Sequence, residues 1–160
     1  MRTIGTLFFF SMLLSMQSCS YPNSIKPYEF SNGWGTNEVA DFNFKGPQNS
    51  SNQDLLFILR HNKNYAFSNI FLIADIKFEN DSIKTDTLEY VLSEKNGKWL
   101  GEKKLSIVEH TLIYKKNLKL IKDSSYTVTV RNSMRLNNEI GPIQNLENIL
   151  DLGLSIQSVK

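Results

Sequence analysis

The sequence IFLIADIKF, residues 70–78, is the most apolar strand candidate of the chain and decides the fold class. In an extended conformation, Phe71 and Ile73 lie on one face, and Ala74 and Ile76 lie on the other. The run is short for a helix and rich in β-branched isoleucine, which favours a strand. We therefore expect a β-strand with two apolar faces here.

Short runs of similar character lie on both sides of this segment, separated by polar turns. The further strand candidates are 39–44 (VADFNF), 55–60 (LLFILR), 86–92 (DTLEYVL), 109–121 (EHTLIYKKNLKLI), 124–134 (SSYTVTVRNSM) and 152–159 (LGLSIQSV). A hairpin turn is predicted at Asn96-Gly97, with a strand opening at Trp99, because Asn-Gly is a strong hairpin signal. Roughly seven to nine short strands at near-regular spacing predict an all-β chain, a single β-sandwich of jelly-roll-like type.

Polar segments between these runs are expected to form loops. They include 46–54 (GPQNSSNQD), 61–69 (HNKNYAFSN) and 79–85 (ENDSIKT). The segment 140–150 has room for one helical turn. The pattern contains no internal repeat and no low-complexity stretch.

The N-terminus has the three parts of a bacterial export signal. Arg2 provides the positive charge, an uncharged and mostly apolar run follows, and Ser18 stands before the only cysteine, Cys19. The run is too short to cross a bilayer, which takes about 20 apolar residues. An ordinary secretory signal cut near Ser18 and an uncleaved anchor are two alternatives. The sharper interpretation is a lipoprotein signal, in which Cys19 carries the lipid, although Gln17 fits the cleavage box poorly.

These features predict a division of the chain into three parts. Residues 1–18 are the signal peptide, 19–27 a lipidated tether and 28–160 the β-sandwich domain. Removal of the signal leaves 142 residues with 17 basic and 16 acidic side chains. That length suffices for one hydrophobic core, and the balanced charge argues against a nucleic-acid partner.

The sequence offers few residues for catalysis or metal binding. The only histidines, His61 and His110, are expected at surface or loop positions, and we predict no metal site and no cofactor. A G-x-S-x-G nucleophile motif is absent. The carboxylates on or near strand candidates are expected to be solvated or to cap turns; they are Asp75, Glu79, Asp86 and Glu89. We therefore predict no catalytic residue and no enzyme.

Lysines gather in the second half of the chain, at Lys103, Lys104, Lys115, Lys116, Lys119 and Lys122. They can guard an edge strand against pairing with other sheets, or they can face an anionic membrane surface or polymer. The acidic neighbours Glu102, Glu109 and Asp123 dilute the charge and favour the edge-strand interpretation.

Each of the two tryptophans, Trp34 and Trp99, can be interpreted in two ways. An exposed tryptophan on a β-sandwich can bind a partner protein or stack on a sugar, and a buried one packs in the core. Core packing is favoured for Trp99 beside the predicted hairpin. Trp34 lies between glycines in SNGWGTNE, which indicates an irregular loop and leaves both interpretations open.

Several longer segments resemble one known family, the GldH-type gliding-motility lipoproteins of the Bacteroidetes. They are TDTLEYVLSEKNGKWLG (85–101) with its G-x-W-L-G element, LIYKKNLKL (112–120), SSYTVTVRNSMR (124–135) with its M-R pair, and LDLGLSIQ (150–157). The signal and Cys19 fit as well. Two segments depart from the family pattern: 136–150 is polar where the family has a short acidic link, and EKKLS follows Gly101 where the family is often glycine-rich.

The resemblance implies a non-catalytic lipoprotein of the gliding-motility and type IX secretion apparatus. Its partners would be other envelope proteins of that machinery, including another lipoprotein, and the membrane through the lipid on Cys19. Trp34, Trp99 and Arg135 are the predicted partner-binding residues. No acidic residue stands between Cys19 and Glu29, which favours a domain on the outer membrane that faces the periplasm. The alternatives are a carbohydrate-binding β-sandwich and, ranked last, an envelope hydrolase.

Overall fold

The computed structural model describes residues 24–136 and 140–159. The predicted signal peptide, Cys19 and the first part of the predicted tether lie outside the described residues. The described chain consists of strands and turns and contains no helix, so it has no helix that could cross a membrane.

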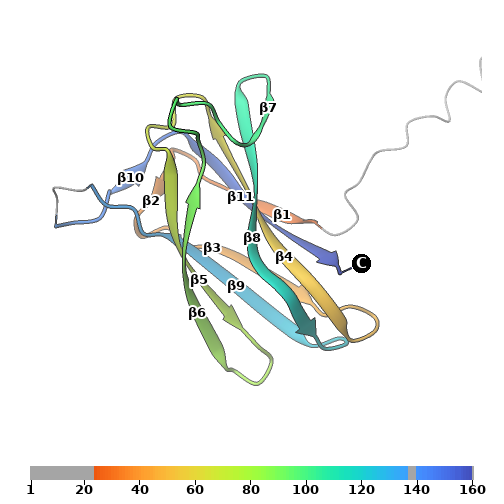
Figure 1. The fold of residues 1–160 in the computed structure, drawn as a ribbon. Coiled ribbons are helices and arrows are strands. Elements are labelled where there is room, and N and C mark those ends of the chain that lie inside the picture. Colours follow the sequence, from red (N-terminus) through yellow and green to blue (C-terminus); the bar gives the residue numbers. More distant parts are fainter. Residues whose placement is uncertain (1–23, 137–139, 160) are drawn as a thin grey trace, which may run out of the picture.

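Strands of two to fourteen residues make up most of the described chain (Figure 1). They are β1 (Ser24–Glu29), β2 (Trp34–Gly35), β3 (Ala40–Lys45), β4 (Ser51–Asn62), β5 (Asn69–Lys77), β6 (Ile83–Val91), β7 (Glu102–Lys104), β8 (Ile107–Leu120), β9 (Ser125–Asn132), β10 (Asn145–Leu146) and β11 (Ile149–Ser158). The candidate strands are found except the one expected to open at Trp99, and β5 covers all but the last residue of the deciding segment. The all-β prediction is confirmed.

Two antiparallel sheets pack face to face. One has the strand order β1-β11-β4-β8-β7, and the other has the order β3-β9-β5-β6. A small third sheet pairs β2 with β10. Only β5–β6 and β7–β8 are neighbours both in sequence and in a large sheet; the other pairs, such as β11 with β4, join strands that are distant in sequence. The β-sandwich prediction is confirmed by this arrangement.

The core lies between the two sheets and follows the alternation of the strands. In β5, every second residue from Ile70 to Ile76 is buried, and in β9 the buried set runs from Tyr126 to Asn132. Phe57 of β4 and Tyr114 of β8 stack inside the sandwich with ring centroids 4.7 Å apart. Each large apolar side chain buried in this way contributes about 1.5–3 kcal/mol.

One side of the sandwich is closed by contacts between the edge strand β6 and the part of β8 that β7 does not cover. The Tyr90 hydroxyl donates to the Ile113 carbonyl at 2.7 Å, and Lys115 pairs with Asp86 at 2.7 Å. Burial raises the pKa of Tyr90 to about 12, with a smaller contribution from Asp86. These contacts hold the two sheets together where no strand bridges them.

The strand registers define two opposite ends of the sandwich. One end, here called the entry end, contains the start of β4, the end of β11 and the β5–β6 hairpin; Ser24, where the described chain begins, pairs with Ser155, three residues before the end of β11. The opposite end, the far end, contains the β4–β5 connection, the segment between β6 and β7, and the end of β9. Figure 1 shows the entry end at the lower right and the far end at the upper left.

Three boundaries differ from those expected. Strand β1 begins at Ser24, so residues 24–27 of the predicted tether belong to the sheet. Pro27 is tolerated because it lies at an irregular register on an edge strand, where no ladder donor is required. Polar residues Ser51–Asp54 extend β4, although a loop was expected there. No helical turn occurs at 140–150, which instead holds β10 and the start of β11.

Candidate functional site

Trp34 does not present its ring to solvent. The side chain is 0% exposed, stacks on Phe30 with ring centroids 4.6 Å apart, and donates Nε1–H to the Glu38 carbonyl at 2.9 Å. The Asn132 amide donates to the Trp34 carbonyl at 3.2 Å. Trp34 is therefore a core residue, and the interpretation of an exposed, partner-binding ring is wrong, because the indole satisfies its donor locally and fills the far end of the core.

The two histidines are buried rather than at the surface, so the prediction for them is wrong. His61 of β4 is 0% exposed and His110 of β8 is 4% exposed. Their rings stack with centroids 5.1 Å apart, and their Nε2 atoms are 3.0 Å apart. The paired strands bring them together although 49 residues separate them.

Hydrogen bonds define the protonation of this histidine pair. The Asn62 carbonyl lies 2.7 Å from His61 Nδ1 and can only accept, so His61 Nδ1 carries the proton. His61 Nε2 therefore accepts from His110 Nε2–H in the neutral pair. Burial lowers the pKa of both rings, for His110 to about 4 with a further contribution from His61. Both rings are neutral at pH 7.

The G-x-W-L-G element forms the cover of this pair. Gly97 has φ 82° in the turn after β6, and its N–H donates to the Glu94 carbonyl at 2.9 Å. Half-buried Trp99 then packs edge-on against His61, with ring centroids 4.5 Å apart. A Cβ at Gly101 would lie 2.5 Å from the Glu109 carbonyl and 2.9 Å from the His110 ring. The second glycine is thus required by the close approach of this loop to β8.

The predicted strand at Trp99 is reduced to a single bridge. Trp99 pairs with Ser93 alone, and Leu100 N–H donates to the Leu92 carbonyl at 2.9 Å. The chain then leaves the hairpin and joins the other sheet as β7. The hairpin turn at Asn96-Gly97 is confirmed, and Trp99 packs against the core as favoured.

An open groove lies on the outer face of the β3-β9-β5-β6 sheet at the far end. Its volume is about 450 Å³. We call it the Arg135 groove; its lining includes Phe67, Phe71, Val91, Met134, Arg135 and Leu136. Val91 is 61% exposed and Leu136 is 43% exposed, so apolar surface is accessible there. Ser68, Asn69 and Glu89 add a polar rim.

The backbone fixes the segment that carries Arg135. The Phe71 N–H donates to Met134 Sδ at 3.3 Å, and Ser133 N–H donates to the Phe71 carbonyl at 2.9 Å. Arg135 itself forms a β-bridge with Pro142. Its side chain is exposed and forms no ion pair with any other described residue. A guanidinium that pairs with no described residue thus lines the groove together with the exposed apolar side chains of Val91 and Leu136.

Aromatic contacts connect the groove to the histidine pair. Tyr65 lies between them, with its ring centroid 5.6 Å from Phe67 and 6.4 Å from Trp99. The Tyr65 hydroxyl donates to the Asn69 carbonyl at 3.2 Å, and burial raises its pKa above the ordinary value. Of the three predicted partner-binding residues, the structure places Trp99 and Arg135 at this end with accessible surface.

The remaining candidate residues take part in local pairs. Asp75 accepts from Arg131 at 2.9 Å, and the Thr85 hydroxyl together with this guanidinium lowers its pKa. Glu89 accepts from the Asn69 amide at 3.0 Å, and Glu79 is exposed. Within residues 24–136 and 140–159, no group of three or more metal-ligating side chains comes together.

The lysine-rich region divides between two strands. Lys103 and Lys104 lie on β7, the edge of the larger sheet, as the edge-strand interpretation requires. Lys104 pairs with Glu109 at 2.6 Å. Lys115, Lys116 and Lys119 belong to the C-terminal half of β8, and Lys122 follows in the turn after it. These lysines lie toward the entry end.

A sugar-stacking platform needs exposed, coplanar aromatic rings. Every aromatic side chain in the described ranges is buried or half-buried, and Trp34 is fully enclosed. The carbohydrate-binding alternative therefore has no support from the described aromatic residues.

The fold has distant likenesses among solved structures. A family 35 carbohydrate-binding module from Clostridium thermocellum gives a TM-score of 0.40 at 11% identity, with 85% of this chain and 90% of that chain covered. A family GH115 4-O-methyl-alpha-glucuronidase, BtGH115A, gives 0.37 at 13% identity, with 84% of this chain and 14% of that chain covered.

Sequence relatives give the family. The chain is 34% identical over 151 residues to a gliding motility lipoprotein GldH homolog of Christiangramia forsetii, with 94% of this chain and 93% of the relative covered. It is 29% identical over 157 residues to the gliding motility lipoprotein GldH of Flavobacterium johnsoniae, with 98% and 96% covered. The family model of the GldH lipoprotein matches residues 25–156. This chain therefore belongs to the GldH family of gliding-motility lipoproteins, membrane-anchored proteins of the cell envelope.

Proposed function

We propose that this protein is a non-catalytic assembly factor of the gliding-motility and type IX secretion apparatus. It assembles or stabilises other envelope proteins, including a second lipoprotein, and is held at the outer membrane, facing the periplasm, by a lipid on Cys19. The relatives' names support the motility role. The absence of acidic residues between Cys19 and Glu29 supports the periplasmic side.

The observation that carries the proposal is the Arg135 groove. The exposed apolar side chains Val91 and Leu136, together with an Arg135 guanidinium that pairs with no described residue, fit a partner segment that has an apolar side chain next to a carboxylate. The groove lies at the far end, away from the point where the described chain begins, so a partner reaches it without meeting the anchor. Trp99 contacts Tyr65, and Tyr65 in turn contacts Phe67 of the groove lining.

The test is co-purification from crosslinked envelopes with tagged wild-type protein and the Arg135→Glu variant. We expect the variant to lose the envelope proteins that wild type retains, because the reversed charge repels a partner carboxylate. Lys63→Glu is the matched control, since Lys63 is also exposed at the far end and the charge change is the same. Equal recovery of partners by Arg135→Glu and wild type would refute the groove as the binding surface.

A further inference from the structure

The entry end is a second functional surface, distinct from the Arg135 groove. Three of the described large apolar side chains are exposed there: Ile83 by 60%, Ile121 by 47% and Val159 by 45%. They come from the β5–β6 hairpin, the β8–β9 turn and the residue after β11. Side chains from separate parts of the chain thus expose apolar surface at one end of the sandwich.

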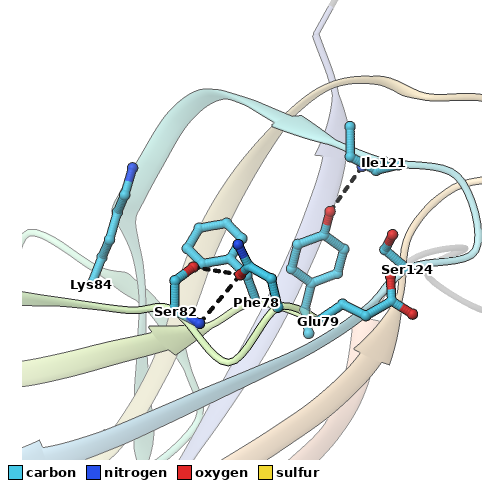
Figure 2. A pocket seen from close by; sticks show the side chains of 8 residues that line it. Phe78, Glu79, Ser82, Lys84, Ile121 and Ser124 are labelled. Carbon is cyan, nitrogen blue, oxygen red and sulfur yellow. Dashed lines mark hydrogen bonds between the residues drawn. The ribbon is translucent and has the colours of Figure 1, made fainter.

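Two shallow hollows lie at the entry end. One is lined by the β5–β6 hairpin and the β8–β9 turn, and its lining includes Phe78 and Tyr126. Figure 2 shows Lys84 on one side of it and Ile121 and Ser124 on the other. The second hollow joins Ile25, Lys45, Leu120 and Ile156 from four strands. The adjacent residues Leu120 and Ile121 line one hollow each.

The charge of the entry end is positive. Its lysines are Lys45, Lys77, Lys84, Lys119 and Lys122, and its nearest carboxylates are Asp54, Glu79, Asp81 and Asp123. Asp81 is paired with Lys77 at 2.7 Å, and Asp123 lies 4.0 Å from Lys122. Asp54 accepts from the Asn117 N–H at 2.7 Å. Lys45, Lys84 and Lys119 form no ion pair among the described residues. Lys84 Nζ lies 5.6 Å from the Phe78 ring centroid, a contact that leaves its charge in place, so all three charges can face an anionic surface.

The chain length keeps this end close to the bilayer. Cys19 precedes Ser24 by five residues, which span at most about 18 Å. Ser24 is paired with Ser155, three residues before the end of β11, so about 10 Å of strand separates it from the entry end, which is less than the tether can span. A lipid on Cys19 therefore brings exposed isoleucines and unpaired lysines within reach of the headgroups, where each basic residue gains from anionic lipid.

We infer that the entry end rests on the membrane surface and binds anionic phospholipid headgroups through Lys45, Lys84 and Lys119, with Ile83, Ile121 and Val159 in contact with the interface. The inference rests on the proposed lipidation of Cys19. It assigns a fixed orientation to the protein: the Arg135 groove points away from the bilayer. The groove's partner plays no part in this contact.

A spin label tests the orientation in the lipidated full-length protein. Lipidation consumes Cys19, so Ile121→Cys supplies the only free thiol for a nitroxide. Leu105→Cys is the matched control, because Leu105 is 96% exposed beside β7 at the far end. The protein is placed in vesicles of phosphatidylethanolamine and phosphatidylglycerol, and collisions with an aqueous nickel chelate and with oxygen are measured.

We expect the label at position 121 to lose contact with the aqueous chelate and gain contact with oxygen, while the label at 105 stays in water. Ile83→Cys provides a second reporter, should the first variant fold poorly. Equal chelate access at 121 and 105, or shielding at 105 alone, overturns the inference. A purified chain without the lipid mass at Cys19 also overturns it, whereas the Arg135 pull-down would be unaffected.

Charge reversal separates headgroup binding from simple tethering. The triple variant Lys45→Glu, Lys84→Glu, Lys119→Glu should return the label at 121 to water, as should vesicles of phosphatidylcholine alone. The control Lys63→Glu, Lys95→Glu, Lys98→Glu makes the same charge change at the far end and should leave the label shielded. An unchanged label in the first triple variant would show that the lysines do not bind the headgroups.

Discussion

At the far end, the packing of single residues depends on contacts with residues of other strands. His61 and His110 share one hydrogen bond, Trp99 covers His61, and Gly101 leaves room for the His110 ring. The G-x-W-L-G element is thereby explained by packing: one glycine makes the turn and the other permits close approach. Both histidines are neutral and buried in the folded protein. Their protonation at low pH therefore destabilises the far end.

The folded protein should lose stability as the pH falls from about 6.5 to 4. The pKa of His110 is lowered to about 4 and that of His61 is lowered as well, while both are near 6.5 when unfolded. The unfolded chain therefore binds more protons in this window, and His110 alone accounts for roughly 3 kcal/mol of lost stability. Burial raises the pKa of Asp151, which offsets part of the loss at the acid end.

Urea unfolding at a series of pH values measures this loss. The variant His110→Phe should show a weaker pH dependence, because one of the two titrating rings is removed. A free energy of unfolding that stays constant between pH 7 and about 4 would contradict the neutral buried pair.

Replacement of Gly101 by alanine should destabilise the protein by about 1 to 3 kcal/mol, because the added Cβ meets the Glu109 carbonyl and the His110 ring. Gly141→Ala is the control, since a Cβ at Gly141 meets nothing within 4 Å. Thermal unfolding of both variants compares the two sites. A Gly101→Ala protein as stable as Gly141→Ala would show that the loop does not pack as described.

At the scale of elements, hydrophobic pattern predicted the strands and missed the contacts between them. β5 and β9 have alternating or continuous apolar side chains and could be read directly. The first residues of β4 are polar, and Pro27 interrupts β1, so pairing with neighbours rather than local sequence determines both strands. The histidine pair depends on the register between β4 and β8, which no local pattern reveals.

The two tryptophans illustrate the same limit. Glycines around Trp34 suggested an irregular exposed loop, yet β2 pairs with β10 and seals the indole in the core. The Arg135 groove combines residues from the β4–β5 connection, β6 and the segment after β9, so only Arg135 itself could be predicted, from the M-R pair.

Truncation of the tryptophans should therefore have unequal effects. Trp34→Ala removes a fully buried ring and its hydrogen bond and should cost about 3 to 5 kcal/mol. Trp99→Ala removes a half-buried ring and should cost roughly 1 to 2 kcal/mol. Chemical denaturation measures both. A larger loss of unfolding free energy for Trp99→Ala than for Trp34→Ala would contradict the assignment of Trp34 to the core and of Trp99 to its cover.

The whole molecule is a sandwich with two differently built ends. The entry end carries lysines and exposed isoleucines, and the far end carries a groove lined by apolar and polar residues and by Arg135, which pairs with no described residue. We propose that this polarity holds a partner at a distance from the bilayer. The central claim is that the partner binds in the Arg135 groove.

Site-specific photocrosslinking in cells tests that claim most directly. A photoreactive phenylalanine at Val91 lies in the groove, and one at Thr87 lies on the same face of β6 outside the groove lining. Both positions are exposed, so neither variant disturbs the core. The account predicts a crosslinked envelope protein from position 91 and none from position 87. Crosslinks from position 87 alone, or equal yields from both positions, would contradict it.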